Sequence, residues 1–132
     1  MAKRYFIQLV ASPDIDPRKC AVGLACAAQA INDGHQVDVF FASFAVKLLN
    51  HKYITGFDDE AGTPAGTCMG FIQTIIDGAN GVHCSTGSMA AVGVTPENAD
   101  GVLIGGWEKC LEWSGPPGVI ELSASSEVAL VY

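Results

Sequence analysis

Hydrophobic and polar positions follow two different spacings along this chain. Short apolar runs at residues 5–11, 37–42, 82–84 and 128–132 have the length and the aliphatic or aromatic content of buried strands. The segments between them repeat apolar residues every three or four positions, as amphipathic helices do. Strands separated by helices predict βαβ units and therefore a parallel sheet.

The first predicted helix has the clearest boundaries. Asp16 is placed to act as its N-cap and Pro17 as its first helical residue. Gly34 is expected to end the helix as its C′ residue. Between these signals, small and apolar residues recur at helical spacing: Ala21, Leu24, Ala25, Ala28 and Ile31.

The middle of the chain has a mixed pattern. Ser43 is placed to cap a short helix, and residues 67–79 are predicted to form a longer one. Residues 50–66 lose all periodicity, and such a long loop is usually functional, mobile or buried at a subunit contact. Its acidic run is expected to be solvated and not to bind metal: Asp58, Asp59 and Glu60.

The last third of the chain is predicted to complete the sheet. Residues 85–92 are expected to form a short helix, residues 102–104 a fourth strand and residues 107–113 another helix. A final helix over residues 119–127 is expected to lead into the last strand.

Length and composition support one compact unit. The chain has 132 residues, of which 49% are hydrophobic and 16% are charged, so it can bury a core. We therefore predict a single α/β domain over residues 1–132, a three-layer α/β/α sandwich with a mainly parallel five-stranded sheet. The few charged residues also suggest that other subunits cover part of the surface.

Charge and cysteine content narrow the class of protein. The net charge of −7 and the absence of a dense Lys/Arg cluster argue against direct binding to nucleic acid or to a membrane. The five cysteines are an odd number without CxxC spacing, which is typical of free thiols in a reducing cytoplasm. No zinc-ligand spacing, Walker loop or GxGxxG motif occurs, so we expect neither metal nor cofactor.

Cys84 is the main candidate for chemistry. It follows a short apolar segment and precedes small polar residues that begin a helix. A thiol at a helix N-terminus is expected to have a lowered pKa, because backbone N–H groups favour the nucleophilic thiolate. The other interpretation is a buried structural cysteine, since free cysteine is among the most buried residue types.

Other polar side chains follow the predicted strands. Because the carboxyl ends of parallel strands lie at one edge of a sheet, these residues are expected to line a cleft there: Ser12, Asp14, Ser43, Ser85 and Thr86. Ser85 and Thr86 are also explained as helix caps. His83 adjoins Cys84, but neighbouring strand residues point to opposite faces, so His83 is not expected to act as its base.

Three stretches together resemble the DsrE/DsrF family of small sulfur-relay proteins. They are the segment from Asp16-Pro17 to the strand ending at Phe41, the segment from Cys84 to Val94, and the segment from Asp100 to Gly106. The resemblance spans nearly the whole chain. The spacing from Cys84 to Gly93 is one residue longer than the common family pattern, and Gly87 and Ser88 stand where some members have a second cysteine.

This resemblance implies a DsrE-like α/β fold that assembles into trimers or hexamers. It also implies that Cys84 accepts sulfane sulfur as a persulfide from a donor protein and passes it to an acceptor, as a sulfurtransferase component would. One alternative is a non-catalytic oligomeric module that binds a small molecule or a protein. Another is a redox sensor, which needs a resolving thiol such as Cys68 or Cys110.

Overall fold

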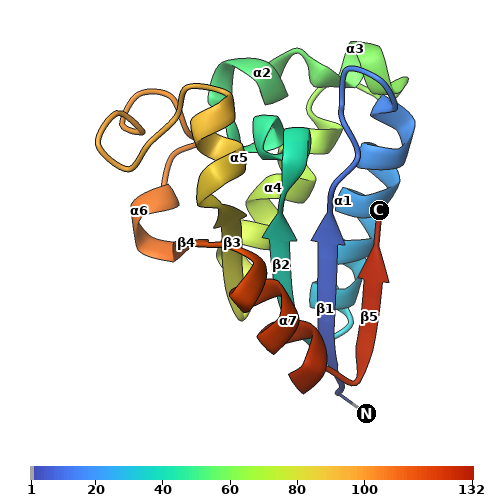
Figure 1. The fold of residues 1–132 in the computed structure, drawn as a ribbon. Coiled ribbons are helices and arrows are strands. Elements are labelled where there is room, and N and C mark those ends of the chain that lie inside the picture. The colour runs from blue at the N-terminus through green and yellow to red at the C-terminus, as the bar shows by residue number, and fades with distance from the viewer. Residues whose placement is uncertain (1) are drawn as a thin grey trace.

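Residues 2–132 are described by a computed structural model of the chain, shown in Figure 1. Its centre is a five-stranded sheet in which every neighbouring pair of strands is parallel, in the order β4-β3-β2-β1-β5. The predicted fold class is confirmed. The strands are β1 (Arg4–Leu9), β2 (Gln36–Phe41), β3 (Gly81–Ser85), β4 (Leu111–Ser114) and β5 (Val128–Val131).

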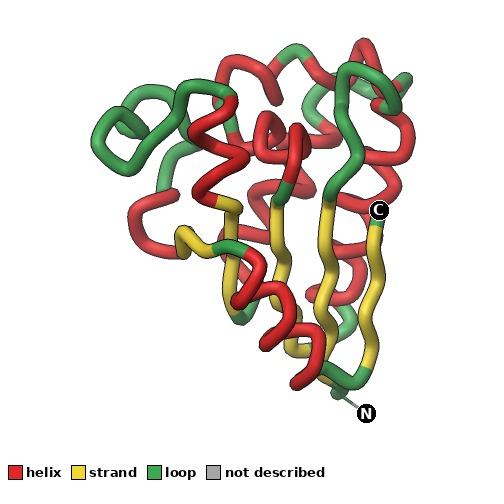
Figure 2. The backbone as a smooth tube through the Cα atoms, in the orientation of Figure 1, coloured by secondary structure: helices red, strands yellow, loops and turns green. Residues whose placement is uncertain are grey.

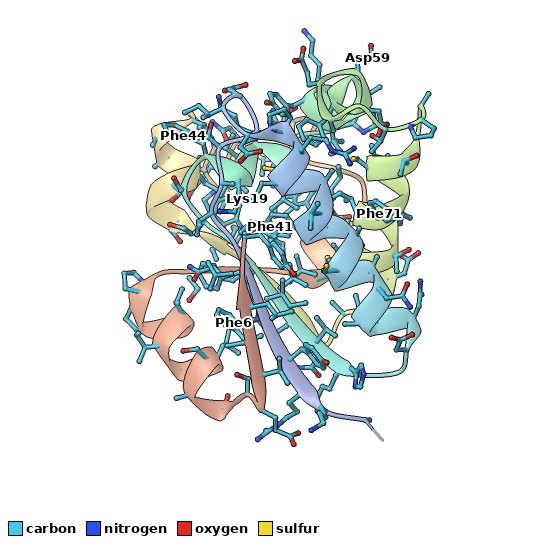
Figure 3. All side chains as sticks on the ribbon, turned by 90° about the vertical axis from the view of Figure 1, so that its right-hand side faces the viewer. Phe6, Lys19, Phe41, Phe44, Asp59 and Phe71 are labelled. Carbon is cyan, nitrogen blue, oxygen red and sulfur yellow. The ribbon has the colours of Figure 1, made fainter. Side chains whose placement is uncertain are left out.

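The helices lie on both faces of the sheet. Helices α1 and α4 pack against each other on one face, and α7 lies on the opposite face (Figures 1 and 3). Short helices surround the carboxyl ends of the strands. The helical elements are α1 (Pro17–Asn32), η1 (Ser43–Leu49), α2 (His51–Thr55), α3 (Phe57–Ala61), α4 (Thr67–Gly78), α5 (Thr86–Ala91), α6 (Trp107–Cys110) and α7 (Pro116–Ser125).

The caps of α1 agree with the sequence signals. Asp16 accepts a hydrogen bond from the Lys19 backbone N–H at 3.1 Å, and Pro17 is the first helical residue. At the other end, Gly34 has a φ of 88°, which glycine adopts without the steric cost that a Cβ imposes. The Gly34 N–H donates to the Ile31 carbonyl, so the helix ends as predicted.

The prediction of a fourth strand at residues 102–104 is wrong. This apolar segment pairs with the chain beside α2, where the His51 N–H donates to the Val102 carbonyl and the Ile104 N–H donates to the Leu49 carbonyl, each at 2.9 Å. Its only ladder contact is an isolated antiparallel bridge between Asn50 and Leu103. Its backbone groups are therefore satisfied away from the sheet.

The fourth strand in chain order is β4, which the sequence pattern had placed within a helix. Only Trp107–Cys110 is helical, and Leu111–Ser114 then pairs with β3 (Figure 2). The alternation Leu-Glu-Trp-Ser has the period of a strand, but four residues are too few for periodicity to distinguish a strand from the end of a helix. The last helix also begins earlier than predicted, at Pro116, and ends at Ser125.

The predicted loop over residues 50–66 holds two short helices, α2 and α3. Each has five residues, so neither shows the repeated apolar spacing that a longer helix displays. Asn50 caps α2 by accepting a hydrogen bond from the Tyr53 N–H at 3.1 Å. Within residues 2–132, no helix is both long and apolar enough to cross a membrane.

Gly23 on α1 permits the close approach of the chain end. A Cβ at this position would overlap Leu9 Cδ2 and lie 3.0 Å from Tyr132 Cβ. We expect Gly23→Ala to lower the free energy of unfolding by about 1–3 kcal/mol, because overpacking forces its neighbours apart. Urea unfolding followed by circular dichroism measures this change.

Gly70→Ala on α4 is the matched control for Gly23→Ala. Gly70 is exposed, and a Cβ there meets no atom within 4 Å. Alanine at an open helical position is expected to raise stability by about 0.5–1 kcal/mol. Equal effects of the two substitutions would contradict the close packing at Gly23.

Candidate functional site

Cys84 lies near the end of β3 and is completely buried, with 0% of its surface exposed. In the sheet register it stands beside Phe41 of β2 and Trp113 of β4. Its side chain belongs to the main hydrophobic core, together with Phe41 and Leu9. The position at a strand-to-helix junction agrees with the sequence, and the environment is that of a structural cysteine.

Burial raises the pKa of the Cys84 thiol to about 12. The expected lowering of this pKa is therefore wrong for the single chain, because the cost of desolvating a thiolate dominates. The following helix, α5, has only six residues. Its capping requirement is met by Ser85, whose Oγ accepts a hydrogen bond from the Ser88 N–H at 3.1 Å.

His83 points to the opposite face of the sheet, as predicted. Its ring stacks on Phe40 with centroids 5.9 Å apart, and its Nε2 lies 3.1 Å from Asp38 Oδ1. Its Nδ1 lies 3.4 Å from a carboxylate oxygen of Glu112. Phe40 faces α7, where a Cβ at Gly118 would lie 3.7 Å from Phe40 Cε2, so His83 is on the α7 side, while Cys84 belongs to the core on the other face.

The five residues predicted to line a cleft do not come together as one group. Ser43 and Ser85 both connect to Ser88, since the Ser43 N–H donates to Ser88 Oγ at 2.9 Å. Ser85 also lines a hollow of about 250 Å³ on the α7 side. Thr86 begins α5, and the Ser12 carbonyl closes the turn after β1 by accepting from the N–H groups of Ile15 and Asp16.

Asp14 is the predicted residue that does line a substantial cleft. The turn after β1 and the segment around α2 and α3 enclose a volume of about 580 Å³, which we call the large cleft. A volume of this size suits a small organic molecule. It is lined by Pro13, Asp14, Asn50, Lys52, Tyr53, Gly56, Phe57 and Glu60.

Sequence reasoning missed the side chains that bind Asp14. Lys47 forms an ion pair with the carboxylate, and Tyr53 Oη donates a hydrogen bond to Asp14 Oδ1 at 2.7 Å. The Lys47 ammonium also lies 5.3 Å from the centroid of the Phe44 ring and 5.9 Å from that of Tyr53. A cation over an aromatic face is attracted by the negative charge of the ring face.

This cluster shifts two pKa values in opposite directions. The Lys47 and Tyr53 hydrogen bonds lower the pKa of Asp14, which therefore stays ionised well below neutral pH. Burial, followed by the hydrogen bond to Asp14, raises the pKa of Tyr53. Tyr53 is therefore a neutral hydrogen-bond donor near neutral pH, and it holds the carboxylate in place.

A second cavity adjoins the large cleft. This small hollow has a volume of about 170 Å³ and shares Asn50 and Tyr53 with the large cleft. Lys47 lines the small hollow but not the large cleft, and Asp14 lines the large cleft but not the small hollow. The other walls of the small hollow are apolar: Val46, Met89, Val92, Val94 and Leu103.

Asp58 is buried, with 4% of its surface exposed, so the prediction of a solvated acidic stretch is wrong at this position. Its carboxylate accepts hydrogen bonds from Thr63 Oγ1 at 2.6 Å, the Gly66 N–H at 2.8 Å and the Cys68 N–H at 2.9 Å. It thereby caps α4 from outside that helix. Across residues 2–132, no group of three His, Cys, Asp or Glu side chains is arranged to hold a metal ion.

All five cysteines are free thiols. The two named as resolving candidates make other contacts: Cys68 Sγ lies 3.7 Å from Thr63 Oγ1, and Cys110 Sγ lies 3.6 Å from the Gly106 carbonyl. Burial raises the pKa of Cys68 to about 11 and also raises that of Cys110. A redox pair with Cys84 has no support in these contacts.

The architecture is similar to that of a solved structure, the crystal structure of the YchN protein from E. coli. The TM-score is 0.61 over 100% of both chains, with 14% sequence identity. YchN has a DsrE-like fold, and at this identity the likeness shows the fold alone. No protein-family model and no curated protein matches the chain.

Proposed function

We propose that this chain is a non-catalytic binding module of the DsrE-like fold that recognises a small molecule in the large cleft. The observation that carries the proposal is a cleft of about 580 Å³ at the carboxyl edge of a parallel sheet, where ligands of α/β proteins generally bind. It combines an aromatic wall with charged groups, since Tyr53 stacks on Phe57 and lies against Asp14.

A substitution that fills the large cleft tests this proposal. Gly56 lines the cleft, and a Cβ there meets no atom within 4 Å, so Gly56→Phe adds bulk without entering the core. A library of small polar and aromatic compounds is screened by ligand-observed NMR. We expect compounds that bind the wild type to lose at least about tenfold in affinity for Gly56→Phe.

The exposed position 70 supplies the control for added bulk. Gly70→Phe places the same side chain on α4 outside the large cleft, and the binding of all compounds should survive it. Compounds that bind wild type and Gly56→Phe equally would refute the large cleft as the site.

We also propose that the chain associates with copies of itself as a trimer or hexamer, the assemblies that its resemblance to the DsrE/DsrF family implies. Helix α7 is the one long helix on its face of the sheet among residues 2–132, and its Ile120 is 68% exposed. Val131 on the edge strand β5 is 60% exposed. Exposed apolar side chains on a thinly covered sheet favour association. Sedimentation should give the mass of three or six chains, and a monomer at micromolar concentration would contradict this.

The second candidate function is sulfur relay through Cys84. It is supported by the resemblance of the Cys84–Val94 segment to the family and by the place of this thiol at the end of β3, directly before the Ser85 cap of α5. In this reaction the Cys84 thiolate attacks the outer sulfur of a donor persulfide. The donor S–S bond breaks, Cys84 keeps the transferred sulfur as a persulfide, and the donor leaves as a thiolate.

The burial of Cys84 makes this reaction the less favoured of the two, because the thiol must first become accessible. Intact-mass spectrometry after incubation with a sulfane-sulfur donor separates the two functions. A binding module gains no sulfur at Cys84. A sulfur carrier gains one or more sulfur atoms that Cys84→Ser loses.

A further inference from the structure

We infer that the natural ligand carries a carboxylate on a small apolar body, with the apolar part in the small hollow and the carboxylate against Lys47. This inference rests on the proposed function, because it names the chemical class of a ligand bound where the small hollow adjoins the large cleft, at the shared residues Asn50 and Tyr53. It is carried by the distribution of charge and apolar surface between the two adjoining cavities.

The small hollow is apolar apart from one edge. Met89 and Leu103 are almost fully buried, so the apolar surface that a ligand can cover in the small hollow is limited and lies mainly at the half-buried Val92. Burial of apolar surface contributes about 25 cal/mol per Å² to binding. The hollow alone holds only a small apolar group, which limits the ligand to a short chain or a single ring.

Among residues 2–132, Lys47 is the one charged residue that lines the small hollow. An ammonium at the edge of an apolar cavity attracts an anion and repels a ligand cation, and the weaker screening near apolar walls strengthens both effects. Asn50 lies at the boundary of the two cavities. Its Oδ1 accepts from the Tyr53 N–H, and its NH₂ group is a donor for a second carboxylate oxygen.

The existing contacts position Lys47 for this role. Asp14 holds the ammonium, and the rings of Phe44 and Tyr53 lie within 6 Å of it. When a ligand carboxylate replaces Asp14 as a partner of the Lys47 ammonium, Asp14 keeps the hydrogen bond from Tyr53 Oη. The carboxylate of Asp14 therefore competes with an anionic ligand for Lys47 without being left unpaired when the ligand binds.

Three probes with the same apolar body and different head groups test the ligand class. Hexanoate, pentan-1-ol and pentylammonium, which share a pentyl chain, are titrated into ¹⁵N-labelled protein at pH 7 and followed through the amide signals of Asn50, Tyr53 and Val92. We expect hexanoate to bind roughly fivefold tighter than pentan-1-ol, as one partly exposed ion pair allows, and pentylammonium to bind weakest.

Four variants separate the contributions of charge and apolar surface. Lys47→Met should make hexanoate bind no tighter than pentan-1-ol, and Asp14→Asn should tighten hexanoate about two- to fivefold by releasing Lys47. Val92→Thr, which keeps the side-chain shape, should weaken hexanoate and pentan-1-ol alike. Lys109→Met removes the same charge at an exposed position that lines neither cavity, and it should change nothing.

The outcomes distinguish this inference from the proposed function. Tighter binding of pentylammonium than of hexanoate, or hexanoate binding that Lys47→Met leaves unchanged, overturns the carboxylate assignment. Another outcome is that all three probes fail to bind while other compounds still bind the wild type and no longer bind Gly56→Phe. In that case the ligand class is wrong and the large cleft remains the site. If no compound depends on Gly56, the proposed function fails as well.

Discussion

The thiol of Cys84 in the folded chain is expected to react with iodoacetamide at pH 8 at least about a thousandfold more slowly than an unfolded cysteine. Only the thiolate reacts, and a pKa of about 12 leaves very little of it at this pH. Complete burial adds a steric barrier, because the reagent must reach a side chain inside the core. Quenched labelling followed by peptide mass spectrometry measures the rate at each cysteine.

The other thiols provide an internal comparison for this experiment. Cys26 and Cys110 are half-buried and should be labelled before Cys84, while the buried Cys20 and Cys68 should be slow as well. Slow labelling of Cys84 should accelerate in urea in step with unfolding. Fast labelling without urea, in protein whose circular dichroism is native, would show that Cys84 is accessible and would restore the sulfur-relay candidate.

The second large effect is expected at Asp58, where Asp58→Ala should lower the free energy of unfolding by about 3–4 kcal/mol. The substitution removes the acceptor for Thr63 Oγ1 and for the N–H groups of Gly66 and Cys68. It also leaves the buried N–H of Cys68 near the N-terminus of α4 without a partner. Urea unfolding measures the loss.

Asp59 supplies the matched control for Asp58. It is the next residue on α3, is exposed and lies at the outer surface of the molecule (Figure 3). Asp59→Ala removes an equal charge and should change stability by less than about 0.5 kcal/mol. Similar losses for Asp58→Ala and Asp59→Ala would contradict the capping role.

The lowered pKa of Asp58 also predicts how the stability of the fold depends on pH. Burial alone would raise the pKa of this carboxyl, but the hydrogen bonds from Thr63, Cys68 and Gly66 outweigh it, and the pKa is lowered. A lowered pKa in the folded state means that the contribution of Asp58 is present above pH 4 or so and is lost as pH falls through the folded value. Asp58→Asn should therefore flatten the acid limb of the stability profile, whereas Asp59→Asn should leave it unchanged.

The parts of the fold that local signals determine could be predicted from the sequence. Asp16, Pro17 and Gly34 mark the ends of α1 because caps and a positive φ are requirements of single positions. The parallel sheet could be predicted because its strands are buried on both faces and have helices between them. The order of the strands and the partner of the segment 102–104 depend on contacts between distant residues, which no local pattern encodes.

The residues of the candidate site also fall into those that local sequence signals predict and those that they do not. Asp14 could be predicted from its place after a buried strand, whereas Lys47 and Tyr53 come 33 and 39 residues later and carry no local sign of contact with it. The position of Cys84 before a helix was also predictable. Its burial was not, because the row Leu9, Phe41, Cys84 and Trp113 forms only when β1, β2, β3 and β4 pair.

The central claim is that function resides in the cavities beside Asp14, Lys47 and Tyr53 and not at Cys84. Amide chemical-shift mapping of the tightest compound from the screen tests it most directly. We predict that the largest changes fall on Asn50 and Tyr53, which line both cavities, together with Gly56 of the large cleft or Val92 of the small hollow. Changes confined to residues 81–85 of β3, or to the hollow beside Ser85 and Ile120, would contradict it.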